Sequence, residues 1–301
     1  MKKIILLMGG ISFGTLFAQD LKSEKGEAYL PVAEEWAIGI DAAPYLNYLG
    51  NMFGKTANNV APTWNYSTVN NTIFGKYFVS EKMAYRASIR LGFGSNTQTM
   101  KVAQRGNATI TEYPTQNPMV ENKMKAGQTN VGIAAGLEWR KGSTRLQGYY
   151  GAEIGFAMNS GKNVYTYGNA LKIDDDAATP DVTVDPIDDD MGSLTTDSHG
   201  NLARIKDDKT SGIGVGVRGF IGAEYFILPK ISIGGEFGWG FMLNTMKMTT
   251  NIESTGANTS GNNFVGSETV EGGKALGVNV DTDAQNTVFG GIGQLRITLH
   301  F

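Results

Sequence analysis

Alternation of apolar with polar or small side chains constrains the fold of this chain more than any other feature. Near the C-terminus, Leu295, Ile297, Leu299 and Phe301 alternate with Gln294, Arg296, Thr298 and His300. A period of two predicts a β-strand with one apolar face. We expect this last strand over 288–301, with Phe289 also on its apolar face. The pattern recurs over residues 36–48, 71–79, 83–95, 131–139, 145–159, 212–228 and 231–244.

The connections between these strands alternate strictly in length. Tight turns at 79–82, 140–144 and 228–230 separate long polar segments at 51–70, 104–126, 169–209 and 251–285. Membrane barrels place short turns on one side and long loops on the other. The pattern therefore predicts an all-β fold, an eight-stranded antiparallel up-and-down transmembrane barrel. Ten strands remain an alternative if one of the long segments contains a membrane hairpin. The strands of a soluble sandwich could show the same alternation of apolar and polar side chains.

The N-terminus is typical of an export signal. Met1, Lys2 and Lys3 precede an apolar run over 4–17, and Ala18 precedes a polar stretch. The run is shorter than a spanning helix, so we expect a cleaved signal peptide over 1–18. A short periplasmic segment over 19–33 and a barrel over 34–301 follow. The chain has no cysteine, which excludes disulfides, thiolate metal sites and a lipidated cysteine. Its net charge of -3 and lack of a basic patch argue against nucleic acid as a partner.

The signal peptide, the glycine-rich alternating strands and the C-terminal Leu-Arg-Ile-Thr-Leu-His-Phe resemble the outer-membrane β-barrel domain family of Bacteroidetes, which is similar in architecture to the small eight-stranded barrels of enterobacteria. The resemblance implies an outer-membrane location, with extracellular loops and both termini in the periplasm. It implies outer-membrane lipid and the barrel-assembly machinery as partners, with Phe301 as the assembly signal. The resemblance implies the fold and the cellular location more firmly than an activity.

The polar faces of the expected strands carry charges of both signs. The cations are Lys76, Arg86, Arg90, Arg145, Arg218 and Arg296, and the anions are Asp41, Glu138, Glu153, Glu224 and Glu236. The lumen of an eight-stranded barrel is only wide enough for side chains, so we expect a network of ion pairs there. The alternative is a small pore lined by fixed charge.

Aromatic residues gather near the expected periplasmic turns, where rings anchor a barrel at the membrane interface. This expected girdle consists of Trp36, Tyr77, Tyr85, Trp139, Tyr225 and Phe301.

Residue types with catalytic or metal-binding chemistry are few. The acidic run over 174–190 could hold calcium, but its spacing is not that of an EF-hand and solvated charge explains it as well. His199 follows Asp197 and Ser198, although adjacent residues seldom form a triad. His300 lies at the expected periplasmic end of the last strand, whereas outer-membrane enzymes keep their catalytic groups at the external rim. We therefore expect no enzyme, no metal and no cofactor, but a rigid platform whose loops contact an extracellular ligand. A pore is the alternative, and a hydrolase or acyltransferase at the external rim is a weaker one.

Overall fold

The structure is a computed structural model, and it describes residues 21–62, 72–104, 118–171, 193–257, 263–280, 289 and 293–301. Nearly all of this part is antiparallel β-sheet, as predicted. The expected signal peptide, the acidic run over 174–190 and parts of the expected loops lie outside the described residues. Among the helices that the structure describes, none has the length and apolar character needed to cross a membrane.

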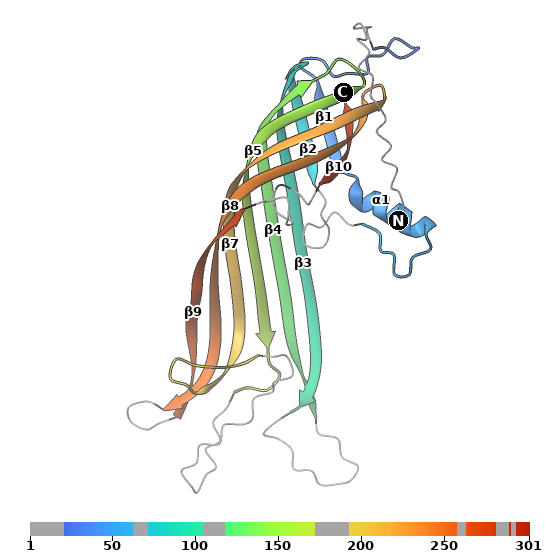
Figure 1. Cartoon of the computed structure of the whole chain (residues 1–301). Coiled ribbons are helices and arrows are strands. Elements are labelled where there is room, and N and C mark those ends of the chain that lie inside the picture. The colour runs from blue at the N-terminus through green and yellow to red at the C-terminus, as the bar shows by residue number, and fades with distance from the viewer. Residues whose placement is uncertain are drawn as a thin grey trace, which may run out of the picture.

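Eight strands form a closed ring (Figure 1). Around the ring they are β1 (Trp36–Asp41), β2 (Ile73–Ser80), β3 (Met83–Ala103), β4 (Met119–Lys141), β5 (Leu146–Thr166), β7 (Leu202–Leu228), β8 (Ile231–Ala257) and β10 (Gln294–His300). The last strand closes the ring by pairing with both β1 and β8. The barrel-like, all-β prediction is confirmed.

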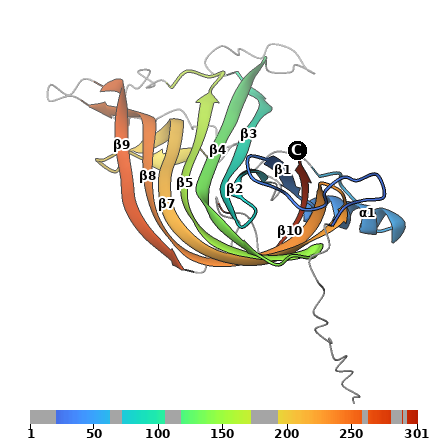
Figure 2. The same ribbon diagram turned by 90° about the horizontal axis from the view of Figure 1, so that it is seen from above.

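Five strands of the ring, β3, β4, β5, β7 and β8, continue far beyond it. β7 and β8 have 27 residues each, about 90 Å at ~3.3 Å per residue. In contrast, β2 pairs with β3 only as far as Ile89, and β10 pairs with β8 only as far as Glu236. Strand β9 (Asn263–Val280) then takes the place of β10 beside β8. The result is a curved sheet in the order β3-β4-β5-β7-β8-β9, which we call the open sheet (Figure 2).

Two expected loops therefore contain strand in most of their described residues. The segment 251–285 contains the end of β8 and all of β9. The segment 104–126 contains the first residues of β4, which pair with β3. Strand β7 likewise begins inside the expected loop 169–209, where β6 (Leu194–Thr196) pairs with it. Polar residues occupy both faces of these strands, so hydrophobic alternation gives no signal for them.

The first expected strand is too long. β1 ends at Asp41, and helix α1 (Ala43–Phe53) occupies the rest of the predicted range and part of the loop. Pro44 lies in the first turn of this helix, where its missing N–H costs nothing. The Asp41 carboxylate also accepts a hydrogen bond from the N–H of Ala43, 3.0 Å away. This bond satisfies one of the free donors at the start of the helix.

The last strand begins later than predicted, at Gln294. Phe289 does not lie on the outer face but is buried with Ala134, Ala157 and Met242, which are on the inner face of the ring. The side-chain amide of Gln294 donates to the Phe289 carbonyl oxygen over 2.6 Å. This aromatic side chain therefore fills the interior instead of facing outward.

Candidate functional site

Glu236 on β8 is the centre of the first half of the ion-pair network inside the ring. Two guanidinium nitrogens of Arg86 lie 2.8 and 3.2 Å from its carboxylate oxygens. Arg218 lies 2.8 Å and Arg296 2.6 Å from the same carboxylate. Arg218 and Arg86 also contact Glu153, at 2.9 and 3.2 Å. Strands β3, β5, β7, β8 and β10 are thus joined through two carboxylates.

The second half of the network lies toward the turns. Lys76 on β2 reaches Glu138 at 2.8 Å and Glu224 at 3.7 Å. Arg140 contacts the same two carboxylates, with 2.9 Å to Glu138. The 3.8 Å approach of Arg86 to Glu138 connects this half to the first.

Burial makes this pairing necessary. The side chains of the network are at most 4% exposed. An isolated charge removed from water loses several kcal/mol of solvation, so each buried charge needs a partner of opposite sign. Because the cations and anions alternate in space, the interior is filled by paired side chains.

Aromatic rings support the cations, and the sequence analysis missed this inner set. The Arg86 guanidinium lies 3.9 Å from the centre of the Phe220 ring, and Arg296 lies 4.4 Å from that of Phe74. Lys76 lies 4.7 Å from the Tyr149 ring centre. Cations over ring faces are stabilised by the ring quadrupole. The signal was available in the sequence, since Phe74 has the parity of Lys76 and Phe220 that of Arg218.

Arg90, Asp41 and Arg145 are the remaining residues of the predicted lumenal set. Arg90 and Asp41 are buried in the ring, and Asp41 lies opposite Arg296 in the register of β1 and β10. Arg145 lies at the turn end of the ring, where it donates to the carbonyl oxygens of Phe226 and Ile227 over 2.7 and 2.6 Å. Its place in the network is taken by Arg140, which the sequence analysis assigned to a turn.

The outer face of the ring is apolar and has aromatic residues at its turn end. The side chains of the expected girdle point outward; Trp36, Tyr85 and Phe301 are more than half exposed, at 56%, 52% and 66%. The rings of Trp36 and Tyr77 are 4.9 Å apart. Trp139 stacks on Tyr150, a residue that the predicted girdle did not include.

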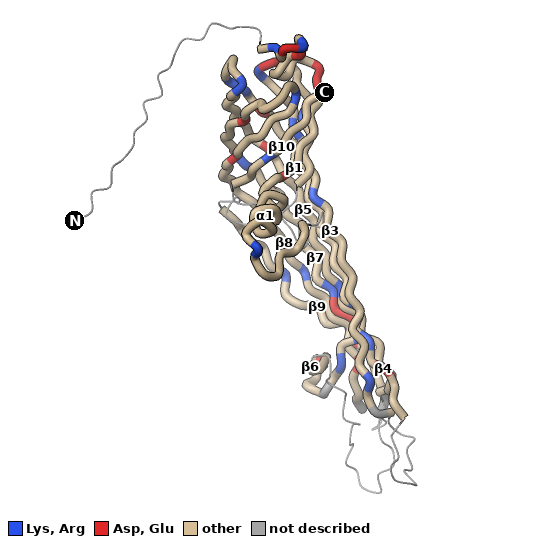
Figure 3. Tube along the Cα trace, turned by 90° about the vertical axis from the view of Figure 1, so that its right-hand side faces the viewer, with Lys and Arg blue, Asp and Glu red and all other residues tan. Residues whose placement is uncertain are grey.

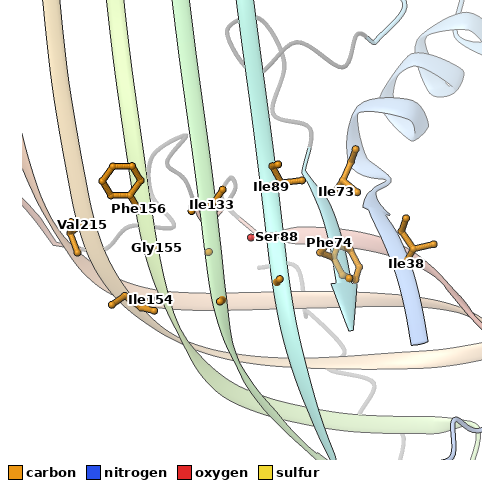
Figure 4. Close-up of a pocket in the computed structure, with 14 residues that line it drawn as sticks. Ile38, Ile73, Phe74, Ser88, Ile89, Ile133, Ile154, Gly155, Phe156 and Val215 are labelled. Atoms are coloured by element: carbon orange, nitrogen blue, oxygen red, sulfur yellow. The ribbon is translucent and has the colours of Figure 1, made fainter. Parts of the chain in front are cut away.

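A shallow groove of about 640 Å³ crosses this outer face (Figure 4). It follows from side-chain size along one register row, in which Gly75, Ala87 and Ala135 lie side by side. Larger side chains such as Ile89 and Ile133 border the row. The groove is a consequence of missing side-chain volume on an otherwise bulky apolar wall.

The two histidines lie in different surroundings, His199 in an exposed turn and His300 in the ring. The Asp197 carboxylate accepts hydrogen bonds from the N–H groups of His199 and Asn201, at 2.9 and 2.8 Å, and so closes a turn. Ser198 Oγ lies 3.2 Å from His199 Nδ1 on an exposed surface. His300 is buried near Ser232, between the rings of Phe78 and Phe226. Among the described residues, no acidic or histidine cluster is arranged to hold a metal ion.

No protein-family model matches the chain, and no curated protein matches it either.

Proposed function

We propose that the chain is a non-enzymatic outer-membrane protein, in which the ring is a rigid membrane platform that presents the open sheet and the long connections outside the cell. The observation that carries the proposal is the reversal of the usual protein pattern in the ring. Its outer face is apolar and its interior holds buried ion pairs. This distribution suits a protein whose solvent is hydrocarbon.

The height of the apolar face supports a membrane span. On β7, outward apolar side chains continue from Tyr225 to Ile213, about 40 Å along the strand at ~3.3 Å per residue. A strand tilt of ~45° reduces this to a height of about 28 Å, close to the hydrocarbon thickness of a bilayer. The aromatic girdle at the turn end has the position of an interfacial anchor. In this setting lipid chains fill the groove around Ala87 and Ala135.

The ion-pair network favours a platform over the alternative, a small pore or transporter. Glu236 holds three arginines that come from different strands, so the charged groups cross the lumen and contact one another instead of lining an open path. Ligand contact then belongs to the open sheet, which extends beyond the apolar face, and to the connections between its strands.

Two measurements test the proposal. Expressed with its N-terminal signal in a Gram-negative host, the chain is expected in the outer-membrane fraction, with heat-modifiable mobility and the open-sheet side accessible to external protease. In planar bilayers the refolded ring is expected to be silent. Recovery from the soluble periplasmic fraction would overturn the membrane platform, and steady salt-dependent conductance would favour the pore.

A further inference from the structure

The outer face changes character abruptly where the closed ring gives way to the open sheet. One register row, through Met158 on β5, Ile213 on β7 and Leu276 on β9, ends the continuous series of apolar rows on the outer face of these strands. The neighbouring positions toward the open sheet carry Ser160 and Ser211, and lysines follow. In Figure 3, where Lys and Arg are blue, blue segments lie along the open sheet. An apolar band bordered by cations is the arrangement that an anionic lipid surface selects.

Four lysines lie on the outer face of four adjacent strands at this border. Lys162 on β5 lies directly opposite Lys209 on β7, and Lys247 on β8 lies directly opposite Lys274 on β9. Like charges that are directly opposed across two strands are destabilising unless a counter-charge lies between them. Two such pairs in neighbouring rows therefore repel each other, and a bound anion would relieve this repulsion.

The carboxylates of the chain relieve only part of this repulsion. Lys247 lies 3.2 Å from Glu271, and Lys162 lies 4.0 Å from Asp207. Among the residues that the structure describes, no carboxylate is within ion-pair distance of Lys209 or Lys274. The border keeps a net positive charge on its outer face.

A surface pocket of about 810 Å³ lies at this border and combines the two chemistries. Lys209, Lys247 and Lys274 line one side, which we call the cationic rim. Met158, Ile213 and Leu276 line the other side, which we call the apolar rim. Small residues between the two rims, including Ser160 and Ser211, leave the space open.

We propose that this pocket binds a membrane lipid with a phosphate headgroup. The phosphate lies among the three amines of the cationic rim, and an acyl chain follows the apolar rim toward the middle of the bilayer. A free phosphate ion would use only half of the pocket, whereas a phospholipid or phosphorylated glycolipid uses both halves. The inference rests on the proposed membrane location and extends it, because it assigns one lipid class to one position on the outer wall.

The test compares lipid retention by the full chain without its signal, inserted into nanodiscs of phosphatidylcholine that contain a small fraction of phosphatidic acid. Native mass spectrometry counts the lipids that stay bound. The variant carries K209Q, K247Q and K274Q. The matched control carries K101Q, K123Q and K125Q, which remove the same charge from the same face of the open sheet outside the pocket. In the control region Glu121 already lies 3.0 Å from Lys123 and opposite Lys101.

The wild-type chain is expected to retain phosphatidic acid in preference to phosphatidylcholine. The variant is expected to lose this preference by about a hundredfold, since each of its three lysines contributes on the order of a fivefold gain in affinity near a lipid surface. The control is expected to change it less than twofold. Equal loss in variant and control would overturn the pocket, because a diffuse field would then explain retention. Displacement of the lipid by millimolar inorganic phosphate would overturn the lipid assignment in favour of free phosphate.

Heat-modifiable gel mobility reports whether the chain has folded and inserted, so the pocket and the membrane platform can be tested separately. A wild-type chain that inserts and folds but shows no lipid preference contradicts the pocket alone. A wild-type chain that does not insert contradicts the membrane platform and the pocket with it. If the triple variant fails to fold, K274Q on the edge strand β9 replaces it, with K101Q as its control. A loss of about fivefold is then expected for this single substitution, and no loss overturns the proposal.

Discussion

Arg86 and Glu236 contact each other through both guanidinium nitrogens although 150 residues separate them in sequence. They lie on β3 and β8, which are not neighbours in the ring, so this pair crosses the lumen. The bidentate geometry is the strongest form of an arginine–carboxylate contact. Glu236 therefore couples opposite walls of the ring.

Glu236→Gln is expected to destabilise the folded ring by about 3–5 kcal/mol, because it leaves Arg86, Arg218 and Arg296 buried with one carboxylate fewer. Urea unfolding in lipid vesicles, followed by tryptophan fluorescence, measures the change. Glu271→Gln, at an exposed position, is the matched control and is expected to leave the midpoint unchanged. An unaltered midpoint for Glu236→Gln would mean that the arginines do not depend on this carboxylate.

The inner face also limits side-chain volume at glycine positions. A Cβ at Gly151 would lie 2.0 Å from the Leu137 carbonyl oxygen and 2.5 Å from the Phe220 ring, whereas one at Gly94 would meet nothing within 4 Å. Gly151→Ala is therefore expected to cost about 1–3 kcal/mol through overpacking, and Gly94→Ala close to nothing. The same urea titration compares them. Equal stability of the two variants would show that the wall moves to admit the methyl group.

Phe289 is the third test of the interior. It is 2% exposed among Ala134, Ala157 and Met242, so Phe289→Ala would leave a cavity. We expect a loss of about 3–5 kcal/mol in the same unfolding assay. Phe237→Ala removes a ring of equal size from the outer face, where lipid refills the space, and should cost much less. A smaller loss for Phe289→Ala than for Phe237→Ala would contradict a packed interior.

The parity of side chains along each strand predicted most of the ring. Because β-strands place successive residues on opposite faces, the alternation of Arg218 and Glu224 with Val217 and Tyr225 was sufficient to separate the inner from the outer face. Ring closure also accounts for the pairing of β10 with β1. Each of these strands would otherwise have an open edge, whose unpaired hydrogen-bonding groups are costly in lipid.

Side-chain alternation did not predict elements whose position does not depend on an apolar face. β9 carries polar residues on both faces, such as Asn279 and Glu271, so it has no amphipathic period to detect. Arg140 was assigned to a turn because a strand end cannot be located to within two residues from composition. Phe289 reaches the interior from a connection, and its placement depends on space left by Ala134 and Ala157, which are distant in sequence.

The depths of two tryptophans test the membrane platform. Trp139 lies beside the turn before β5, whereas Trp239 lies about 26 Å along β8 from its first residue at ~3.3 Å per residue, or about 19 Å in height at a ~45° tilt. In single-tryptophan variants, bromines near the middle of the lipid chains are expected to quench Trp239 more than Trp139. Bromines near the headgroups should reverse the order. Equal quenching by both positions would contradict a transmembrane ring.

Asp197 allows a pH test outside the ring. Burial acts against its ionisation, but hydrogen bonds from the side chain and N–H of Asn201 and from the N–H of His199 outweigh this and lower the pKa of Asp197 to about 2. Since the pKa is lowered on folding, the turn over 197–201 keeps its stabilisation above the ordinary carboxyl pKa and loses it as the pH falls through about 2. Carbon-13 NMR of the labelled carboxyl group measures the midpoint. Asn201→Ala is expected to move that midpoint up toward the ordinary value. A midpoint near 4 in the unsubstituted chain would show that the carboxylate does not hold the turn, and would leave it available to the His199 imidazole.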